Sequence, residues 1–239
     1  MPEIWGRVTR ESRVRFIKVP AFLLIILSLL VQAGGREPRA GSYNILLDKK
    51  SVGVERFEQT LSGQNMVVRS TTEITSGTAT QKVTAVTELS GGRPVRYEME
   101  MAAGERSQKY SLQFEAGTAR VVIEAYGRRS ERAVPVSEGV MLLDKNVWHH
   151  YELLINRFDM SKRGPQRFPV LTPQAGLREY VAEVELKEKT MYNAGGAKVR
   201  ANSFVVTLGE GYEATVIVDE SNRVLSIEVP ALDTKVVLQ

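Results

Sequence analysis

The sequence contains no cysteine among its 239 residues. Without thiols the chain cannot form disulfides, use a thiolate nucleophile or hold a metal through sulfur. Acylation of an amino-terminal cysteine is excluded for the same reason. If the protein is exported, its fold must be held by its hydrophobic core alone.

Signatures of common catalytic sites are also absent. The chain has no G-x-S-x-G elbow, no H-E-x-x-H pair, no G-x-G-x-x-G and no phosphate-binding glycine loop. Its two histidines, His149 and His150, are adjacent. Adjacent side chains on a helix point about 100° apart, so the two histidines cannot easily bind one metal ion. His149 and Glu152 are three residues apart, a spacing that metal ligands use, but they form only a weak pair. We therefore expect no metal, no cofactor and no enzymatic activity.

Two pairs of glutamates are the remaining candidates for acid–base chemistry. Glu98 and Glu100 alternate with apolar residues on one expected strand, as do Glu183 and Glu185 on another. Catalysis would require at least one of these carboxyls to be desolvated so that its pKa rises. The alternation instead predicts two solvated sheet faces, which leaves a carboxylate hydrolase as the weakest functional hypothesis.

Excess charge is scarce outside the amino terminus. Residues 1–33 carry five basic and two acidic side chains, a net of +3, so only about +1 of the chain's total of +4 belongs to the rest. This predicts no nucleic-acid partner, which would need a basic stripe on the folded domain. Basic residues followed by the apolar run of residues 21–31 and by small residues predict a signal peptide that is cleaved after Ala33. The alternative is an uncleaved anchor, which would be the chain's sole membrane contact.

The remaining 206 residues are sufficient for one domain with a sizeable core. Residues 34–41 are rich in glycine and predict a flexible tether, and residues 42–239 predict a single β-rich domain. Alternating apolar residues bounded by turn residues recur roughly every ten residues. In the clearest case Val95, Tyr97, Met99 and Met101 face one way. We expect about eleven strands in one long, curved antiparallel sheet, a half-barrel. A closed barrel and a two-sheet sandwich are the alternatives.

One stretch, residues 142–158, interrupts the strands with helical periodicity. Val147, Trp148, Tyr151, Leu154, Ile155 and Phe158 fall within an arc of about 120°. This predicts a helix near residues 144–158, capped by Asp144 or Asn146, whose apolar face lies on the concave side of the sheet. His149, Glu152 and Asn156 are expected on the opposite face in water, with His150 at the edge of the apolar arc. Leu153 lies among the polar residues and breaks the pattern.

Apolar residues expected on inward faces define the candidate site. If sheet and helix do not close completely, some of these residues line a slot for an acyl chain or another apolar ligand. The candidate ligand-lining residues are Trp148, Tyr151, His150 and Leu154 on the helix, with Tyr97 and Phe114 opposite. Complete packing of these side chains into a core is the alternative.

Several short segments carry a family resemblance. They are Gly41-Ser42-Tyr43-x-Ile45, Val52-Gly53, residues 92–98 and residues 218–227. In these segments and in layout the chain resembles uncharacterised exported bacterial proteins with a domain of unknown function. These are in turn similar to the half-barrel fold of periplasmic lipoprotein carriers. The resemblance implies a curved sheet wrapped around helical structure, with lipid held between them.

Two functional hypotheses of different classes follow. The first is a non-enzymatic periplasmic protein that binds an apolar or lipid-like ligand between the curved sheet and the helix. The second is an envelope interaction or scaffold module with a solid core and no ligand, which docks an envelope protein partner through Leu153 and residues 168–173. Bound lipid, or its absence, discriminates between them.

Overall fold

A single fifteen-stranded sheet dominates the computed structural model, which describes residues 39–209 and 211–239. Neighbouring strands pair antiparallel except β9, which lies parallel to β10. The strands are β1 (Arg39–Leu47), β2 (Lys50–Ser62), β3 (Asn65–Ser76), β4 (Ala79–Ser90), β5 (Arg93–Ala103), β6 (Arg106–Glu115), β7 (Thr118–Ala125), β8 (Arg128–Pro135), β9 (Met141–Leu142), β10 (Gln166–Thr172), β11 (Arg178–Ala194), β12 (Ala197–Leu208), β13 (Tyr212–Asp219), β14 (Val224–Val229) and β15 (Thr234–Leu238).

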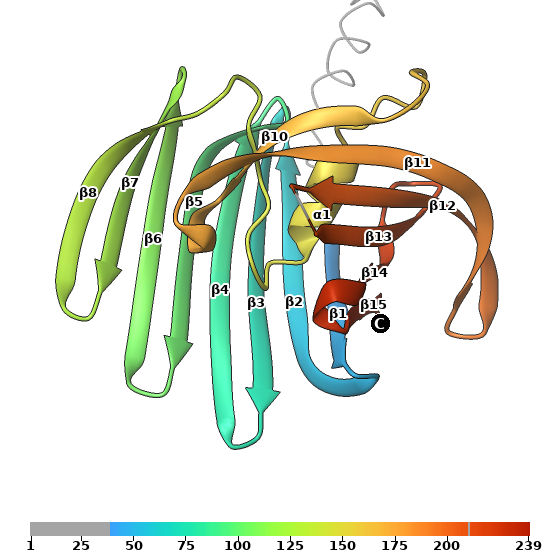
Figure 1. The fold of residues 1–239 in the computed structure, drawn as a ribbon, viewed down its shortest axis with the longest axis horizontal. Coiled ribbons are helices and arrows are strands. Elements are labelled where there is room, and N and C mark those ends of the chain that lie inside the picture. Colours follow the sequence, from blue (N-terminus) through green and yellow to red (C-terminus); the bar gives the residue numbers. More distant parts are fainter. Residues whose placement is uncertain (1–38, 210) are drawn as a thin grey trace, which may run out of the picture. The chain divides into compact units, whose positions relative to one another are not determined.

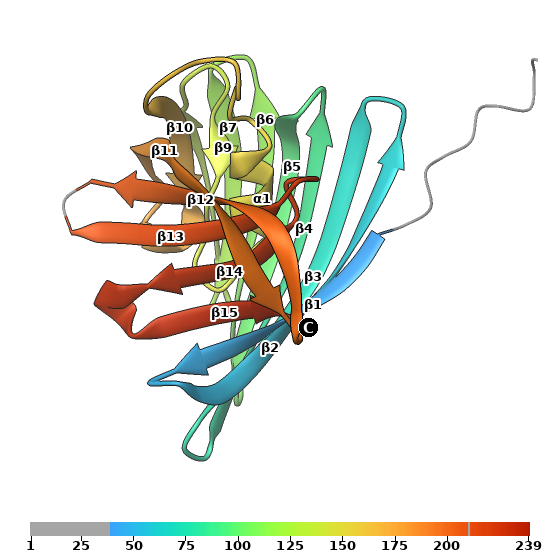
Figure 2. The ribbon, with the colours of Figure 1, turned by 90° about the vertical axis from the view of Figure 1, so that its right-hand side faces the viewer.

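The order of the strands places the two ends of the described chain in the middle of the sheet. It runs from β8 down to β1, then from β15 down to β9, because β1 pairs with both β2 and β15. The sheet thus has two limbs that meet at the β1–β15 seam. The first limb consists of β1–β8 and the second limb of β9–β15. Figures 1 and 2 show the limbs curling so that α1 (His149–Ile155) lies between β2–β5 and β10–β14. The open, curved sheet with one α-helix inside its curl confirms the expected architecture.

Alternation of burial along the strands explains why the sheet has an inner face. In β4 the side chains of Val83, Ala85, Thr87 and Leu89 are buried while their neighbours are partly or fully exposed. This period of two is the pattern of a strand with one face against a core. Tight turns join the hairpins, and Gly117 occupies one of them with a φ of 72°, a conformation that glycine adopts without steric cost.

The number and limits of the strands differ from the expectation. The sheet has fifteen strands rather than about eleven, and one of them, β9, consists of only two residues. β1 begins at Arg39, so the last residues of the expected tether are paired with β2. Val95 is 40% exposed because the register between β4 and β5 shifts between Glu88 and Leu89, which turns Pro94 inward instead. Such a bulge re-aims the flanking side chains.

The α-helix is shorter and more deeply enclosed than the periodicity predicts. It spans only His149–Ile155, and all seven of its residues are buried. Asn146 interrupts any earlier helical turn because it adopts a left-handed φ of 60°. Two short 3-10 helices, η2 (Pro173–Ala175) and η3 (Pro230–Leu232), complete the described elements. Residues of β1, β2 and β14 cover the side of α1 that was expected to face water.

Two hydrophobic clusters fill the curl. The larger joins α1 to β1–β4 on one limb and to β10–β14 on the other, with Phe57, Leu154 and Phe204 among its members. The smaller joins β4–β7 to the chain around β9 and β10, with Tyr97, Leu142 and Leu171 among its members. The core therefore lies between the limbs and depends on residues from both.

No helix within the described residues is long and apolar enough to cross a membrane. The predicted signal peptide and residues 34–38 of the predicted tether lie outside the residues that the structure describes.

Candidate functional site

A carboxylate on the inner face of β2 anchors the start of α1. Glu55 is fully buried, and its Oε2 accepts the backbone N–H groups of Trp148 at 2.9 Å and His149 at 3.2 Å. Its Oε1 lies 2.8 Å from Nδ1 of His149. No side-chain cap comes from the helix's own N-cap residue, Trp148. Glu55 therefore satisfies free amides of the first turn that Asp144 or Asn146 was expected to cap.

His150 is held as a neutral ring by two contacts. Its Nδ1 accepts the backbone N–H of Asp144 at 3.2 Å, so the ring proton belongs to Nε2, which donates to Oγ1 of Thr87 at 3.0 Å. Burial, and secondarily the neighbouring His149, lowers the pKa of His150 well below its usual 6.5. The His150 ring thus links the backbone of Asp144 to Thr87 of β4.

Asp144 is a second buried carboxyl in the same centre. Its Oδ2 accepts the hydroxyl of Tyr97 at 2.9 Å, and its Oδ1 accepts the backbone N–H groups of Lys145 and Gln174, each at 3.0 Å. Burial raises the pKa of Asp144 from 3.8 to about 6 and outweighs these hydrogen bonds, which lower it. Burial also raises the pKa of Tyr97 well above 10, with a smaller contribution from Asp144.

These contacts form a polar centre, which we define as Glu55, Thr87, Asp144, His149 and His150. None of its members exceeds 6% exposure. Among the described residues no three His, Asp or Glu groups are placed to hold one metal ion. The geometry supports a structural role, in which these buried groups hydrogen-bond one another, apart from Nε2 of His149, which has no partner among the described residues, and fix the chain before α1 against β2–β5.

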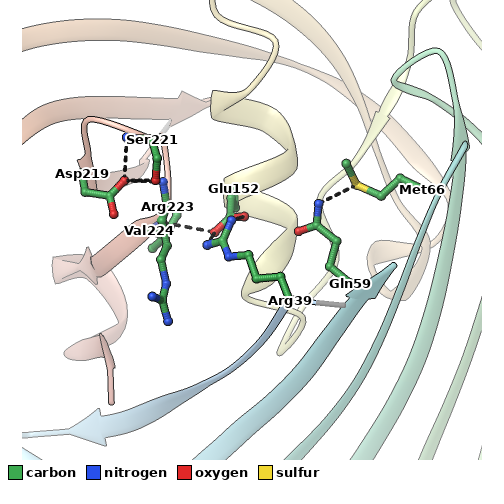
Figure 3. Close-up of polar contacts among 8 residues, drawn as sticks. All are labelled: Arg39, Gln59, Met66, Glu152, Asp219, Ser221, Arg223 and Val224. Carbon is green, nitrogen blue, oxygen red and sulfur yellow. Dashed lines mark hydrogen bonds and ion pairs between the residues drawn. The ribbon is translucent and has the colours of Figure 1, made fainter. Parts of the chain in front are cut away.

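A second polar link joins α1 to the rim of both limbs. Glu152 accepts two hydrogen bonds from the guanidinium of Arg39, at 2.9 and 3.0 Å, and one from the backbone N–H of Val224 at 3.2 Å. Figure 3 shows this bidentate pair beside α1, with the Gln59–Met66 contact on the first limb and the Asp219–Ser221 turn on the second. Because Arg39 is in β1 and Val224 begins β14, one helical carboxylate ties three elements together.

Three residues that were expected on a polar helix face are buried. His149, Glu152 and Leu153 are 3%, 4% and 7% exposed, so the prediction that His149 and Glu152 face water is wrong. Leu153 belongs to the larger cluster and cannot present a docking surface. The cause is contact with strands distant in sequence: His149 meets Glu55 of β2, and Glu152 meets Arg39 of β1 and the start of β14, which helical periodicity cannot reveal.

The candidate ligand-lining residues lie within the packed interior. Trp148 stacks on Tyr151 at a centroid distance of 6.2 Å, and the Tyr151 hydroxyl hydrogen-bonds that of Tyr212. Leu154 is fully buried in the same cluster. The other three lie elsewhere: His150 is in the polar centre and 5.5 Å from the ring of Tyr97, and the half-buried Phe114 packs against the smaller cluster. Their role as ligand lining stays a prediction.

The two glutamate pairs occupy the outer face in ion pairs. Glu98 lies 2.6 Å from Arg96, Glu183 lies 3.0 Å from Arg167, and Glu185 pairs with Lys187. All three carboxylates are partly exposed, and Glu100 is exposed. None has the desolvated setting that a general acid requires.

A hollow of about 710 Å³ lies at the far end of the β11–β12 hairpin. We call it the Met hollow, and define it by Met160, Lys189, Met191, Arg200, Asn202 and Glu220. Lys189 pairs with Asn202 and Met191 with Arg200, and Asn202 precedes the buried Phe204 by two residues. These side chains therefore share the inner face of the sheet. The hollow is open to solvent, since Met160 and Met191 are 46% and 56% exposed.

Sequence reasoning missed the Met hollow because the alternation of Tyr180, Ala182, Val184 and Leu186 does not continue beyond Leu186. β11 continues to Ala194 through a bulge between Leu186 and Glu188. The bulge moves the following side chains to the opposite phase, so the period-two alternation of apolar residues in the sequence breaks there. Met191, four residues before the Gly195-Gly196 turn, was the available signal.

The fold and these contacts define the class of protein: an open, β-barrel-like sheet wrapped around one short helix. Residues 42–229 match the family described as a protein of unknown function (DUF3108), and the chain belongs to that family. The structure is similar to the crystal structure of a β-barrel-like protein of the DUF1849 domain of unknown function from Brucella abortus. That match has a TM-score of 0.59 and 12% sequence identity, and it covers 84% of this chain and 94% of the other. A search of curated proteins finds no match.

Proposed function

We propose that the protein is a non-enzymatic, periplasmic binding protein that holds a lipid-like ligand on the concave face of its sheet, with the apolar part of the ligand in the Met hollow. The observation that carries the proposal is the pair Met160 and Met191, about half exposed on the inner face. Large apolar side chains exposed together in a hollow are favourable only when an apolar partner covers them.

The composition of the Met hollow suits a ligand of this class. Methionine is unbranched and flexible, so it adapts to acyl chains of different shape. Lys189 and Arg200 border the two methionines and provide donors for a polar or anionic headgroup. Arg200 lies 3.8 Å from Glu220, an exposed pair that a headgroup can replace at little cost.

The position of the Met hollow relative to α1 relates it to the earlier candidate residues. Met160 follows Phe158, which packs on Phe204 with ring centroids 5.1 Å apart. Trp148, Tyr151 and Leu154 then support the helix that leads to this segment. The proposed ligand is of the class predicted from the sequence. Its proposed contact site is the sheet beyond the carboxyl end of α1, rather than the space beneath α1.

The proposal includes export. We infer that residues 1–33 are a signal peptide and that the mature protein begins at Gly34. Amino-terminal sequencing of protein purified from the envelope of its own cells tests this. A first residue of Gly34 is expected, and a chain that retains its apolar segment contradicts cleavage.

Mass spectrometry of solvent extracts tests ligand binding. Protein purified without detergent from its native envelope is expected to carry a stoichiometric lipid-like molecule. The variant Met191→Asp is expected to carry much less of it, because an ionised carboxylate in the hollow opposes apolar contact. Wild-type protein that yields no bound lipid contradicts the proposal.

The complete enclosure of α1 favours a second candidate, an envelope interaction module with a solid core. Its surface would be β8, an edge strand whose residues are exposed except for the half-buried Val134. An unpaired strand edge accepts an added strand from a partner. The extraction experiment separates the candidates, since this module carries no lipid.

A further inference from the structure

A second hollow contains three arginines. It lies mainly on β1–β3, whereas the Met hollow lies on the β11–β12 hairpin. It measures about 810 Å³, and we call it the Arg hollow. Neighbouring strands β1, β2 and β3 form it together with the end of β15 and the turn before β14. Its charged side chains are those of Arg56, Glu58, Arg69 and Arg223.

Pairing between strands brings two of the arginines close together. Glu58 of β2 lies opposite Arg69 of β3, and Arg56 is two residues from Glu58 on the same face. Arg56 and Arg69 are therefore diagonal neighbours, within reach of one bound group. Both are exposed and alternate with the buried Phe57 and Ser70.

Arg223 reaches the Arg hollow from the second limb. Its backbone N–H donates to Oδ1 of Asp219 at 2.9 Å, and Figure 3 shows its guanidinium extending away from that turn. The Nε of Arg223 is buried, and no described residue accepts a hydrogen bond from it. Because Arg223 also lines the hollow, its guanidinium brings a third set of N–H donors to a group bound there.

Positive charge exceeds negative charge among the side chains that line the Arg hollow. None of the three guanidinium groups takes part in an ion pair with a described residue, whereas other outer-face arginines do, such as Arg96 with Glu98. The side chains that line the hollow, three arginines and one glutamate, sum to +2.

We propose that the Arg hollow binds a phosphate group. The planar fork of a guanidinium matches phosphate oxygens with two parallel hydrogen bonds, and a phosphate dianion balances the charge of +2. The group comes from a soluble phosphate compound or from a phospholipid headgroup at the envelope, and this site acts independently of the Met hollow.

Titration calorimetry with inorganic phosphate, at constant ionic strength set by chloride, tests the proposal. Saturable binding is expected, weakened about tenfold or more by Arg223→Gln and by Arg56→Gln. Glu58→Gln is expected to tighten binding because it removes the carboxylate that repels the anion. Arg106→Gln, an exposed arginine on β6, is the matched control and should leave affinity unchanged. Absence of saturable binding, or equal losses with Arg106→Gln, overturns the proposal.

Vesicles identify the source of the phosphate. Binding to vesicles that contain phosphatidic acid, whose phosphomonoester can carry two negative charges, but not to phosphatidylcholine vesicles, with loss in Arg223→Gln, assigns a phospholipid headgroup. Binding of inorganic phosphate without vesicle binding assigns a soluble compound, and failure of both assays rejects the site. Met191→Asp should leave phosphate affinity unchanged, so failure of the lipid-binding proposal remains distinguishable from failure of this one.

Discussion

Two titratable residues of the polar centre respond to pH in opposite senses. The pKa of Asp144 is raised in the folded state, so its contribution to stability is present below pH 3.8 and is lost as the pH rises through about 6. The pKa of His150 is lowered, so its contribution is present above 6.5 and is lost as the pH falls towards the folded value. Between about pH 4 and 6 the two effects on stability oppose each other.

Asp144→Asn tests the first effect. Asparagine imitates the protonated carboxyl and can keep the hydrogen bonds to Tyr97 and Gln174. The free energy of unfolding at pH 8 is expected to rise, by at most about 3 kcal/mol, the value of roughly two pKa units. Urea denaturation should show this gain shrinking as the pH falls to 4. A variant that is no more stable at pH 8 contradicts the account. Asp159→Asn is the control. Hydrogen bonds from Ser161 lower the pKa of that exposed residue, so its replacement is expected to lower the free energy of unfolding at pH 8 rather than raise it.

His150→Gln tests the second effect. The amide retains a donor for Thr87 but has no group that gains a proton on acidification. The variant is expected to be less stable than wild type at pH 8, because the backbone N–H of Asp144 loses its hydrogen bond to Nδ1 of the ring. Its free energy of unfolding should fall less than that of the wild type between pH 6.5 and 4.5. Equal slopes against pH for the two proteins would show that His150 does not titrate in this way.

At the scale of the element, α1 depends on a residue of β2. Glu55→Ala leaves two backbone N–H groups and the ring of His149 without their acceptor. We expect a loss of about 3 kcal/mol or more and faster amide exchange at His149–Ile155, with the β6–β7 hairpin unchanged. Glu58→Ala, on the exposed face of the same strand, should change stability by no more than about 0.5 kcal/mol. Unchanged exchange in α1 for Glu55→Ala would remove Glu55 from this role.

The same element shows what local sequence reveals. Trp148, Tyr151 and Leu154 are buried as the apolar arc predicts, because the spacing of side chains on a helix is a local property. Asn146, whose left-handed backbone precedes the helix, carries no decisive sequence signal, and the helix was therefore predicted too long. The burial of Glu152 and Leu153 depends on Arg39 and on the second limb, contacts that no local window contains.

At the scale of the whole molecule, the β1–β15 seam makes one sheet of two limbs. Most strands were predictable from alternation, but the pairing of Tyr43 with Leu238 joins residues too distant for any periodicity to reveal. Each hollow combines a local hairpin with residues distant in sequence, Met160 and Glu220 in the Met hollow and Arg223 and Gln239 in the Arg hollow. Strand existence was therefore predictable, whereas the position of each hollow was not.

The shared core predicts cooperative unfolding. Val236 of β15 is fully buried beside β1, and the larger cluster contains residues from both limbs. Urea transitions followed by tryptophan fluorescence, which reports on Trp148, and by far-ultraviolet circular dichroism are expected to coincide. Val236→Asp should lower the midpoint of both together, because it places a charge in the core. Separate transitions for the two probes would show that the limbs are independent units.

Titration of purified protein with a fluorescent long-chain fatty acid tests the proposed function most directly. We expect saturable binding that Met191→Asp weakens about tenfold or more, since the loss of one apolar contact is worth about 1.5–3 kcal/mol. Val181→Asp is the matched control, because Val181 lies on the same strand and is 55% exposed, against 56% for Met191. The account predicts that the control binds as the wild type does. No saturable binding by the wild type, or equal losses in both variants, would contradict it.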